Sequence, residues 1–495
     1  MRSVSLILLL LAAGCAVGPD YRVPAAPEVS TYTPGTLPVA TASAEAPQGA
    51  PQRFVTGMDI PGQWWMLFHS TALNELIAQS LRANPSLAAA QAALRQAREN
   101  TAAQRGAYYP QVSAGLSASR NLTPTATLSP ASASGNPYYS LFTPQLSVSF
   151  VPDVFGANAR AVESLEAQEE NERFQLEATY LTLAANVVAA AVQEASLRGQ
   201  IEATEQTIRI ETDLLDILRR QLELGQIAGA DVAIQEAALA QAQQALPPLR
   251  KQLAQQRDLL AALAGHYPSE EVAARFDLAS LQLPPELPVS LPAKLVAQRP
   301  DVRAAEAMLH AASAQIGVAV AARLPQFMLT AEIGSQADAI SRLFTPGTAF
   351  WTLGAGLTQP IFEGGTLLHK QRAAEAGFDQ AAAQYRSTVL TAMQNVADTL
   401  HALQSDADAL AAAVATERAA ARSLEITRRQ LQLGQVAYVA LLNAEQIYQL
   451  ARITTVQAEA GRLADTAALF QALGGGWWNR SDVAADDAAT SVRVR

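Results

Sequence analysis

A ten-residue stretch occurs twice in this chain, 209 residues apart, and it constrains the fold more than any other feature. The two copies are RRQLELGQIA, at residues 219–228, and RRQLQLGQVA, at residues 428–437, and eight of the ten positions are identical. Each copy ends a long heptad-like run at a glycine and is followed at once by another helical run. Because glycine often closes helices and a short link joins the helices of an αα-hairpin, the repeat predicts two similar halves, each folded back at one tip.

Both halves share one order of elements: a helix, two alternating strands, a very long helix, the tip and a final helix. We expect strands at 112–119, 146–150, 327–334 and 351–358, long helices at 155–222 and 365–433, and a solvated loop at 120–143. In each strand apolar residues alternate with small or polar ones, which is typical of one apolar and one wet face. A helix of about 68 residues is on the order of 100 Å long, far beyond one globular domain. The fold class is therefore mainly α with a small β part, built from duplicated long α-hairpins of coiled-coil type.

Only these four strands are expected, and each is about as long as a strand that crosses a bilayer. The smallest known membrane-spanning barrels have eight strands, so four cannot close one. Closure requires strands from several chains, and the sequence therefore predicts an oligomer. No run after residue 14 approaches the ~20 apolar residues of a membrane-spanning helix. Aromatic residues near the strand ends, such as Tyr108, Tyr139 and Trp351, fit the interface girdles of such barrels or are ordinary strand aromatics.

The N-terminus has the features of a targeting segment. Arg2 precedes an apolar run from Val4 to Leu11, and small residues then lead into Cys15, the only cysteine in the chain. This arrangement resembles a bacterial lipoprotein signal, with Cys15 diacylated, the chain cleaved before it and the new amino group acylated. The alternative is a short signal peptide with an incidental cysteine. Ala16 stands where Asp tends to retain lipoproteins in the inner membrane, which favours the outer membrane.

Composition divides the chain into six predicted segments. They are a lipoprotein signal peptide (1–14), a lipidated and extended N-terminal tether (15–62), a first structural repeat (63–265), a crossover linker (266–297), a second structural repeat (298–473) and a polar C-terminal tail (474–495). The tether is rich in Pro, Ala, Thr and Ser, and the linker contains the run LPPELPV at 283–289, so both are expected to be extended.

Charge and motifs exclude several classes of function. The net charge is −10 and no Lys/Arg-rich patch with interleaved aromatics occurs, so we expect no nucleic-acid partner. The five histidines are scattered without HExxH spacing, and the chain has no GxSxG, P-loop or dinucleotide-binding motif. We therefore expect neither a catalytic nor a metal site, no enzyme activity, and no cofactor beyond the covalent lipid on Cys15. Energy for any transport must come from a partner.

Five motifs occur at residues 15–21 (CAVGPDY), 64–65 (WW), 299–306 (RPDVRAAE), 359–362 (QPIF) and 473–477 (LGGGW). Together they resemble the outer membrane factor lipoproteins, the TolC-like ducts of Gram-negative efflux pumps. The opening motif and the RPDVRAAE segment are specific, whereas the tryptophan pair and the glycine run alone are weak signals. The similarity covers nearly the whole chain after the tether and includes the internal duplication.

The resemblance implies a homotrimer. Three chains contribute four transmembrane strands each to a 12-stranded barrel in the outer membrane, and their hairpins form a tunnel through the periplasm, with the crossover linker at its equator. A periplasmic adaptor (membrane fusion) protein and an inner-membrane transporter of the RND type dock from below. The protein is then expected in the bacterial outer membrane, lipid-anchored and barrel-inserted, with a long periplasmic part.

By the same resemblance, the adaptor meets the twin tips at Gly225, Gln226, Ala228, Gly434, Gln435 and Ala437. Family members often carry acidic side chains six or nine residues after each tip glycine, where they ring the aperture and hold it shut. Asp231 keeps this position in the first hairpin, but Ala440 and Asn443 occupy the two positions of the second, so a strong acidic ring is not expected. Val439 falls at the position of a hydrophobic constriction. Alternatively, Asp231 and Asn443 are ordinary residues of a helix N-terminus, where Asp is favourable in any case.

Two classes of function remain open on these observations. The first is a passive exit duct for small toxic compounds or drugs, opened at its tip by partners, with a protein-exporting duct of a type I secretion system as a variant. The second is a structural coiled-coil lipoprotein of the envelope that has no lumen. Conductance across a planar bilayer separates the two, because a structural stalk forms no channel.

Overall fold

The computed structural model describes residues 16–122 and 138–480. The predicted signal peptide, its lipidated Cys15 and residues 481–495 of the predicted tail lie outside the described residues. Two compact units are present. The first comprises the chain to Pro24, Ala93–Glu172 and Ala305–Tyr385, and the second comprises Ala25–Ala92, Arg173–Ala304 and the chain from Arg386. Each unit contains segments from both halves of the sequence, and the boundaries of the two predicted repeats stay predictions.

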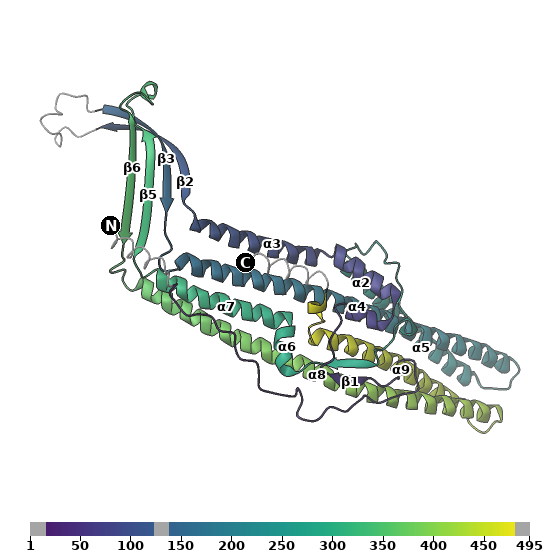
Figure 1. The fold of residues 1–495 in the computed structure, drawn as a ribbon. Helices are drawn as coiled ribbons and strands as arrows, with labels where there is room; N and C mark the ends of the chain where they lie inside the picture. Colours follow the sequence, from purple (N-terminus) through teal and green to yellow (C-terminus); the bar gives the residue numbers. More distant parts are fainter. Residues whose placement is uncertain (1–15, 123–137, 481–495) are drawn as a thin grey trace. The chain divides into compact units, whose positions relative to one another are not determined.

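Two very long helices dominate the fold. Helix α4 spans Ala157–Glu223 and helix α8 spans Thr366–Gln432, and each has 67 residues. Each is followed by a helix of 35 residues, α5 (Gly229–Leu263) or α9 (Tyr438–Ala472), that returns along it (Figure 1). The long helices predicted at 155–222 and 365–433 are thus confirmed, with ends displaced by at most two residues. The two hairpins are equal in length, so the sequence duplication persists in three dimensions.

The remaining helices are shorter. They are α2 (Thr71–Ala83), α3 (Pro85–Arg105), α6 (Pro292–Gln298), α7 (Pro300–Ala321) and the 3-10 turns Trp64–Phe68, Gly106–Tyr108, Leu278–Ser280, Ile340–Arg342 and Trp477–Asn479. Both α3 and α7 begin at a proline, whose missing N–H would be unpaired in a first turn anyway. Helices α4 and α7 each contain an 18-residue window of mean hydropathy 1.2, of which 50% and 44% is buried within the chain. Such burial is typical of core helices, so these windows are weak indications of a membrane span.

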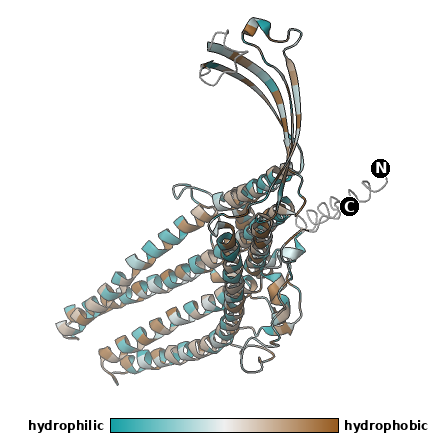
Figure 2. Ribbon diagram, turned by 90° about the vertical axis from the view of Figure 1, so that its left-hand side faces the viewer, coloured by the Kyte–Doolittle hydropathy of each residue, from teal (hydrophilic) through white to brown (hydrophobic). Residues whose placement is uncertain are grey.

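Four antiparallel strands form one sheet in the first unit, in the order β2-β3-β5-β6. They are β2 (Gln111–Leu122), β3 (Tyr138–Phe150), β5 (Gln326–Ser335) and β6 (Ala349–Thr358). One row of paired residues across the sheet is apolar and consists of Ala114, Leu146, Ile333 and Trp351. The adjacent row lies on the other face and is polar, and it consists of Ser113, Ser147, Glu332 and Thr352. Figure 2 shows this alternation along the strands. The predicted apolar and wet faces are therefore confirmed.

Strand β3 is longer than its sequence pattern predicts. Residues 138–143, which we expected in a solvated loop, pair with β2, for example Phe142 with Ala118. The expectation is also wrong for residues 120–122, which belong to β2. A composition rich in Ser, Thr and Pro hides these ends because cross-strand pairing, rather than local propensity, decides where a strand stops.

A second sheet contradicts the expectation of only four strands. Strand β1 (Arg53–Thr56) pairs in parallel with β4 (Glu286–Val289) in the second unit. Strand β1 lies in the predicted tether, and β4 lies in the predicted crossover linker, which also contains α6 except for its last residue. Each strand has only four residues, too few to show an alternation, and its partner is distant in the sequence. Tertiary pairing alone therefore creates this sheet.

Residues 41–52 of the predicted tether lie against α9. Arg462 is 1% exposed and donates hydrogen bonds to the carbonyl oxygens of Gln48 (2.6 Å) and Ala50 (3.0 Å). It also donates to Oε1 of Gln52 (3.2 Å). A buried guanidinium needs several acceptors, and this segment supplies them. The tether is therefore anchored along this stretch rather than freely extended.

The tryptophan pair and the glycine run build the core of the second unit. The ring of Trp64 stacks on that of Phe470, with centroids 5.3 Å apart. Gly476 has a φ of +69°, and a Cβ there would lie 2.4 Å from a backbone carbonyl oxygen, so only glycine fits. The predicted tail is folded as far as Arg480, which forms an ion pair with the buried Glu177 (2.7 Å). These two motifs are thus explained by packing.

Candidate functional site at the hairpin tips

Both hairpin tips close their long helix in the same way. The N–H of Gln226 donates to the carbonyl oxygen of Gln221 (2.8 Å), and the second tip repeats this bond at the corresponding positions (2.9 Å). Gly225 and Gly434 both have a φ of +71°. This combination is the Schellman motif, in which a glycine in the left-handed region lets the last carbonyl groups of the helix find partners. The predicted glycine-closed tips are confirmed.

The helices that leave the two tips also start alike but carry different side chains. Ala228 and Ala437 occupy the N-cap positions with extended backbones and give no side-chain cap. In the first turn, the N–H groups of Asp231 and Ala440 bond to the cap carbonyl oxygens at 3.1 and 2.9 Å. The backbones of the two tips therefore agree, while only the first tip has a carboxylate at its helix N-terminus.

Every residue predicted to face an adaptor is exposed: Gly225, Gln226, Ala228, Gly434, Gln435 and Ala437. The side chains predicted for the aperture differ in exposure. Val439 is 51% exposed and Asn443 is exposed, whereas Asp231 is partly buried. Within the described part of the chain, the side-chain amide of Asn443 has no hydrogen-bond partner. Since the predicted aperture lies between copies of the chain, the roles of these residues stay predictions.

A hydrogen-bonded chain joins the second hairpin to the first just behind the tips. The hydroxyl of Tyr438, the first residue of α9, donates to Oε1 of Gln235 on α5. The buried Gln235 in turn donates through Nε2 to the carbonyl oxygen of Glu211 on α4 (2.8 Å) and to its carboxylate. Burial raises the pKa of the Tyr438 phenol, so the hydroxyl keeps its proton. The Tyr438 ring thus acts as the contact between the hairpins.

Each hairpin also carries an Arg–Glu pair at the same position of the repeat. Arg219 and Glu236 are 2.8 Å apart in the first hairpin, and both side chains are half exposed. Arg428 and Glu445 are 3.1 Å apart in the second, but the Glu445 side chain is only 3% exposed. Burial raises the pKa of the Glu445 carboxyl, the bond from Arg428 opposes this, and the neighbouring carboxyl of Glu211 raises the pKa further. One pair is therefore a surface ion pair and the other belongs to a buried site.

Tyr438 is also packed into both hydrophobic clusters near the tips. The first cluster consists of Leu215, Leu218 and Val232, with Ile227, Leu239 and Tyr438 packed against it. The second consists of Leu424, Leu441 and Ala444, with Leu214, Leu431, Tyr438 and Tyr448 packed against it. Because one ring serves both clusters, separation of the hairpins exposes apolar surface in each.

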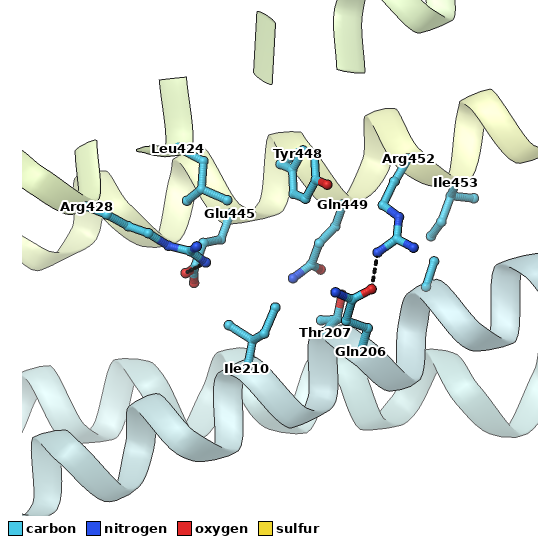
Figure 3. A pocket seen from close by; sticks show the side chains of 11 residues that line it. Gln206, Thr207, Ile210, Leu424, Arg428, Glu445, Tyr448, Gln449, Arg452 and Ile453 are labelled. Atoms are coloured by element: carbon cyan, nitrogen blue, oxygen red, sulfur yellow. Dashed lines mark hydrogen bonds and ion pairs between the residues drawn. The ribbon is translucent and has the colours of Figure 1, made fainter. Parts of the chain in front are cut away.

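A cavity of about 190 Å³ lies beside Glu445. Figure 3 shows α4 on one side of it and α8 and α9 on the other, with Arg428 and Glu445 at one end. Arg452 of α9 donates a hydrogen bond to Gln206 of α4 across this space (Figure 3). The cavity is large enough to admit water to the buried carboxyl group.

Sequence reasoning missed the residues that connect the hairpins. They share one signal, since each is large and polar where the equivalent position of the other half is small: Tyr438 against Gly229, Gln235 against Ala444, and Glu211 against Ala420. A search for such differences between the two repeats would have found them. In the described ranges, 16–122 and 138–480, no group of three His, Cys, Asp or Glu side chains is placed to hold a metal ion.

Comparisons with known proteins agree with this architecture. A family profile described as "Outer membrane efflux protein" matches residues 76–266 and 291–475. The toluene efflux pump outer membrane protein TtgC of Pseudomonas putida is 29% identical over 487 residues, which cover 97% of this chain and 96% of that protein. The pyoverdine export outer membrane protein OpmQ of Pseudomonas aeruginosa is 30% identical, over 84% of this chain and 87% of that protein. A solved structure of the outer-membrane channel OprN is 26% identical with a TM-score of 0.82, covering 94% of this chain and 100% of that one.

Proposed function

Because the chain belongs to the outer membrane efflux protein family, we propose that it is the outer-membrane exit duct of a tripartite efflux system. It conducts small toxic compounds or drugs passively from the periplasm to the exterior once partners open its periplasmic tip. Similarity to a toluene efflux protein supports this class of substrate. The partners are a periplasmic adaptor and an inner-membrane transporter of the RND type.

The four-stranded sheet is the observation that carries the proposal. Its apolar face is exposed, with Leu116, Trp351 and Leu353 all about three quarters exposed. In the described residues, β2 and β6 each have a neighbouring strand on one side only. A sheet with an exposed apolar face and two open edges requires lipid on the face and further strands at the edges. Three copies supply the further strands as a 12-stranded barrel, and the outer membrane supplies the lipid. Strands of 10 to 13 residues are long enough to cross a bilayer.

The lipid on Cys15 is part of the same proposal. The residues that follow Cys15 are held at the start of α4, because the N–H of Val17 bonds to the carbonyl oxygen of Phe155 (3.1 Å). Asp20 adds an ion pair with Arg160 (2.9 Å). Since α4 follows β3 directly, an acyl chain on Cys15 enters the membrane beside the proposed barrel and anchors it in the outer membrane.

The proposed gate is the periplasmic aperture formed by the hairpin tips. The adaptor engages the exposed tip residues, and Asp231, Val439 and Asn443 line the aperture. Opening requires the second hairpin to move away from the first. The contact from Tyr438 to Gln235 then breaks, and the two tip clusters that share the Tyr438 ring separate.

The test combines channel recordings with efflux measurements. The purified full-length protein in planar bilayers is expected to form channels, and cells that lack it are expected to retain dye and become more sensitive to toxic compounds. A Cys15→Ala variant exported with a cleavable signal separates barrel insertion from lipid anchoring. A protein that gives no channels and whose loss leaves dye retention unchanged is not a duct, and a structural lipoprotein of the envelope is then the better description.

A further inference from the structure

Two buried carboxyl groups meet where the second hairpin contacts the first. We propose that Glu211 and Glu445 bind one proton between them, and that this proton ties α9 to α4, so that the gate loosens as the pH rises. The proton site is a property of the chain itself. Its effect on the gate rests on the proposed function.

The hydrogen bonds around this pair leave one donor missing. Tyr438 donates to Gln235, and Gln235 donates to the carboxylate of Glu211. At the other end, Arg428 donates to Oε1 of Glu445 (3.1 Å). The two carboxyl groups lie within hydrogen-bond reach of each other, yet Oε2 of Glu445 is buried and receives no hydrogen bond from another group of the described residues.

Two facing carboxylate oxygens are both acceptors and cannot bond to each other. Proton uptake at Oε2 of Glu445 turns that oxygen into a donor to Glu211. The chain of hydrogen bonds from Tyr438 to Arg428 is then complete. A buried polar atom without a partner is costly, so Oε2 of Glu445 needs either this proton or a water from the adjacent cavity, and only the proton joins the two carboxyl groups directly.

The charges that face the pair favour the same protonation state. Arg428 of α8 supplies one positive charge, whereas Glu211 of α4 and Glu445 of α9 supply two negative charges when both are ionised. The negative charge of Asp231 on α5 also acts on this region, since it helps to raise the pKa of the Tyr438 phenol. With one proton the pair and its arginine are neutral, and without it they carry an excess buried charge, which is strongly unfavourable.

The direction of the pH effect follows from linkage. Burial, with Glu211 adding to it, raises the pKa of Glu445 in the closed arrangement above the value of a solvated glutamate. A raised pKa of an acid contributes stability that is present at low pH and is lost as the pH rises through the raised value. The contact between the hairpins is therefore tightest in acid and weakens towards neutral and alkaline pH. One proton changes the opening equilibrium by at most about tenfold per pH unit.

The first hairpin provides a matched control. Glu236 occupies the repeat position of Glu445 and pairs with Arg219 as Glu445 pairs with Arg428, but it is half exposed. No second carboxyl group is paired with it among the described residues. A substitution of Glu236 therefore removes the equivalent charge without touching the shared proton.

Channel recordings on the full-length protein between about pH 5 and about pH 8 test the effect on the gate. The wild type and Glu236→Gln are expected to open more often as the pH rises. Glu445→Gln and Glu211→Gln are each expected to stay closed with a flat pH profile, because an amide at either position supplies the missing donor permanently. Wild-type pH dependence in both glutamine variants, or its loss in Glu236→Gln, overturns the role in gating.

Infrared spectroscopy of the detergent-solubilised protein tests the proton without any need for conduction. The difference between wild type and Glu445→Gln is expected to show a carboxylic acid band that titrates above about pH 4.3, the value of a solvated glutamate. The pKa of Asp465 is also raised, to about 7, by burial and by Asp406, but its band is present in both proteins and cancels. A titration midpoint at or below about 4.3 contradicts the shared proton. A wild type that forms no channels but shows this band contradicts only the duct.

Discussion

The two hairpin tips have the same backbone and different side-chain partners. Gly225 and Gly434 close their helices with the same φ and the same hydrogen bonds, and the outgoing helices both have 35 residues. In the first hairpin the Arg219–Glu236 pair faces solvent, whereas in the second Glu445 is buried against α4. The duplication has thus preserved geometry, while the side chains have diverged until one hairpin fits against the other.

This divergence has a simple physical reason. The contact between the hairpins joins unlike surfaces, the start of α9 with the C-terminal part of α4 and the start of α5. A large side chain on one surface needs space on the other, and Tyr438 reaches Gln235 although the repeat equivalent of Tyr438 is Gly229.

The largest expected effect comes from Tyr438→Ala. It removes the ring shared by both clusters and leaves Oε1 of Gln235 without its donor, at a cost of about 3 kcal/mol in stability. The tips are expected to separate, and channel conductance is expected to rise. Tyr438→Phe keeps the packing and loses only the hydrogen bond, so its cost is about 1 kcal/mol. Thermal unfolding in detergent measures both values, and equal losses would show that the ring does not bridge the hairpins.

Arg462→Leu is expected to have the next largest effect. Leu253 is the residue at the same position of the first hairpin, so this change makes the two hairpins alike there. The carbonyl oxygens of Gln48 and Ala50 lose a charged donor, at a cost of about 2 to 3 kcal/mol. Limited proteolysis should then cut the 41–52 segment while α9 stays intact. Continued protection of that segment would mean that other contacts suffice to hold it.

Alanine at either tip glycine is expected to cost about 1 kcal/mol, because an L-residue is strained at a φ of +71°. A Cβ meets nothing within 4 Å at either position, so the conformational strain is the whole effect. The decisive measurement compares Gly225→Ala with Gly434→Ala by hydrogen exchange in the last turns of α4 and α8. Losses that differ several-fold between the tips would contradict the equivalence of their backbones.

The smallest effects on stability, below about 1 kcal/mol, are expected for the residues in the first two turns of the outgoing helices that differ between the tips. Ala440→Asp gives the second tip the charge of Asp231 and should increase the preference for cations over anions, as should Asn443→Asp. Asp231→Ala should reduce this preference. Reversal potentials in a salt gradient measure the ion preference of these three variants, and values unchanged from the wild type would place the residues away from the ion path.

Asn443→Ala should raise the conductance if the amide forms a closing hydrogen bond between copies. Single-channel recordings measure this, and an unchanged conductance would contradict that role.

Much of the fold is predictable from the sequence because its signals are local and repeated. The repeated RRQLxLGQxA stretch predicts the tips, since glycine at a helix end needs no distant partner to favour the left-handed region. Alternation in 327–334 predicts strand β5 and its two faces for the same reason. The strand β1 was missed because four residues with Pro and Thr nearby carry no pattern, and only pairing with β4 makes them a strand.

Some residues of the candidate site can likewise be predicted from the sequence, and others cannot. The exposed tip residues follow from the position of each glycine in the repeat. The contact from Tyr438 through Gln235 and Glu211 does not, because it depends on which faces of three helices meet. The spacing of Arg428 and Glu445 recurs in Arg219 and Glu236, but the burial of Glu445 depends on the first hairpin.

The sequence by itself determined the duplication, the long helices, the glycine-closed tips and the two faces of the sheet, because periodicity and backbone preference act over a few residues. Only the tertiary structure decided that the predicted tether folds onto α9 through Arg462 and that Glu445 faces a second carboxyl group. Burial and charge depend on what packs from elsewhere in the chain. For that reason two hairpins with nearly identical tips differ in the burial of one glutamate. By our proposal, the protonation of this glutamate makes the second hairpin sensitive to pH.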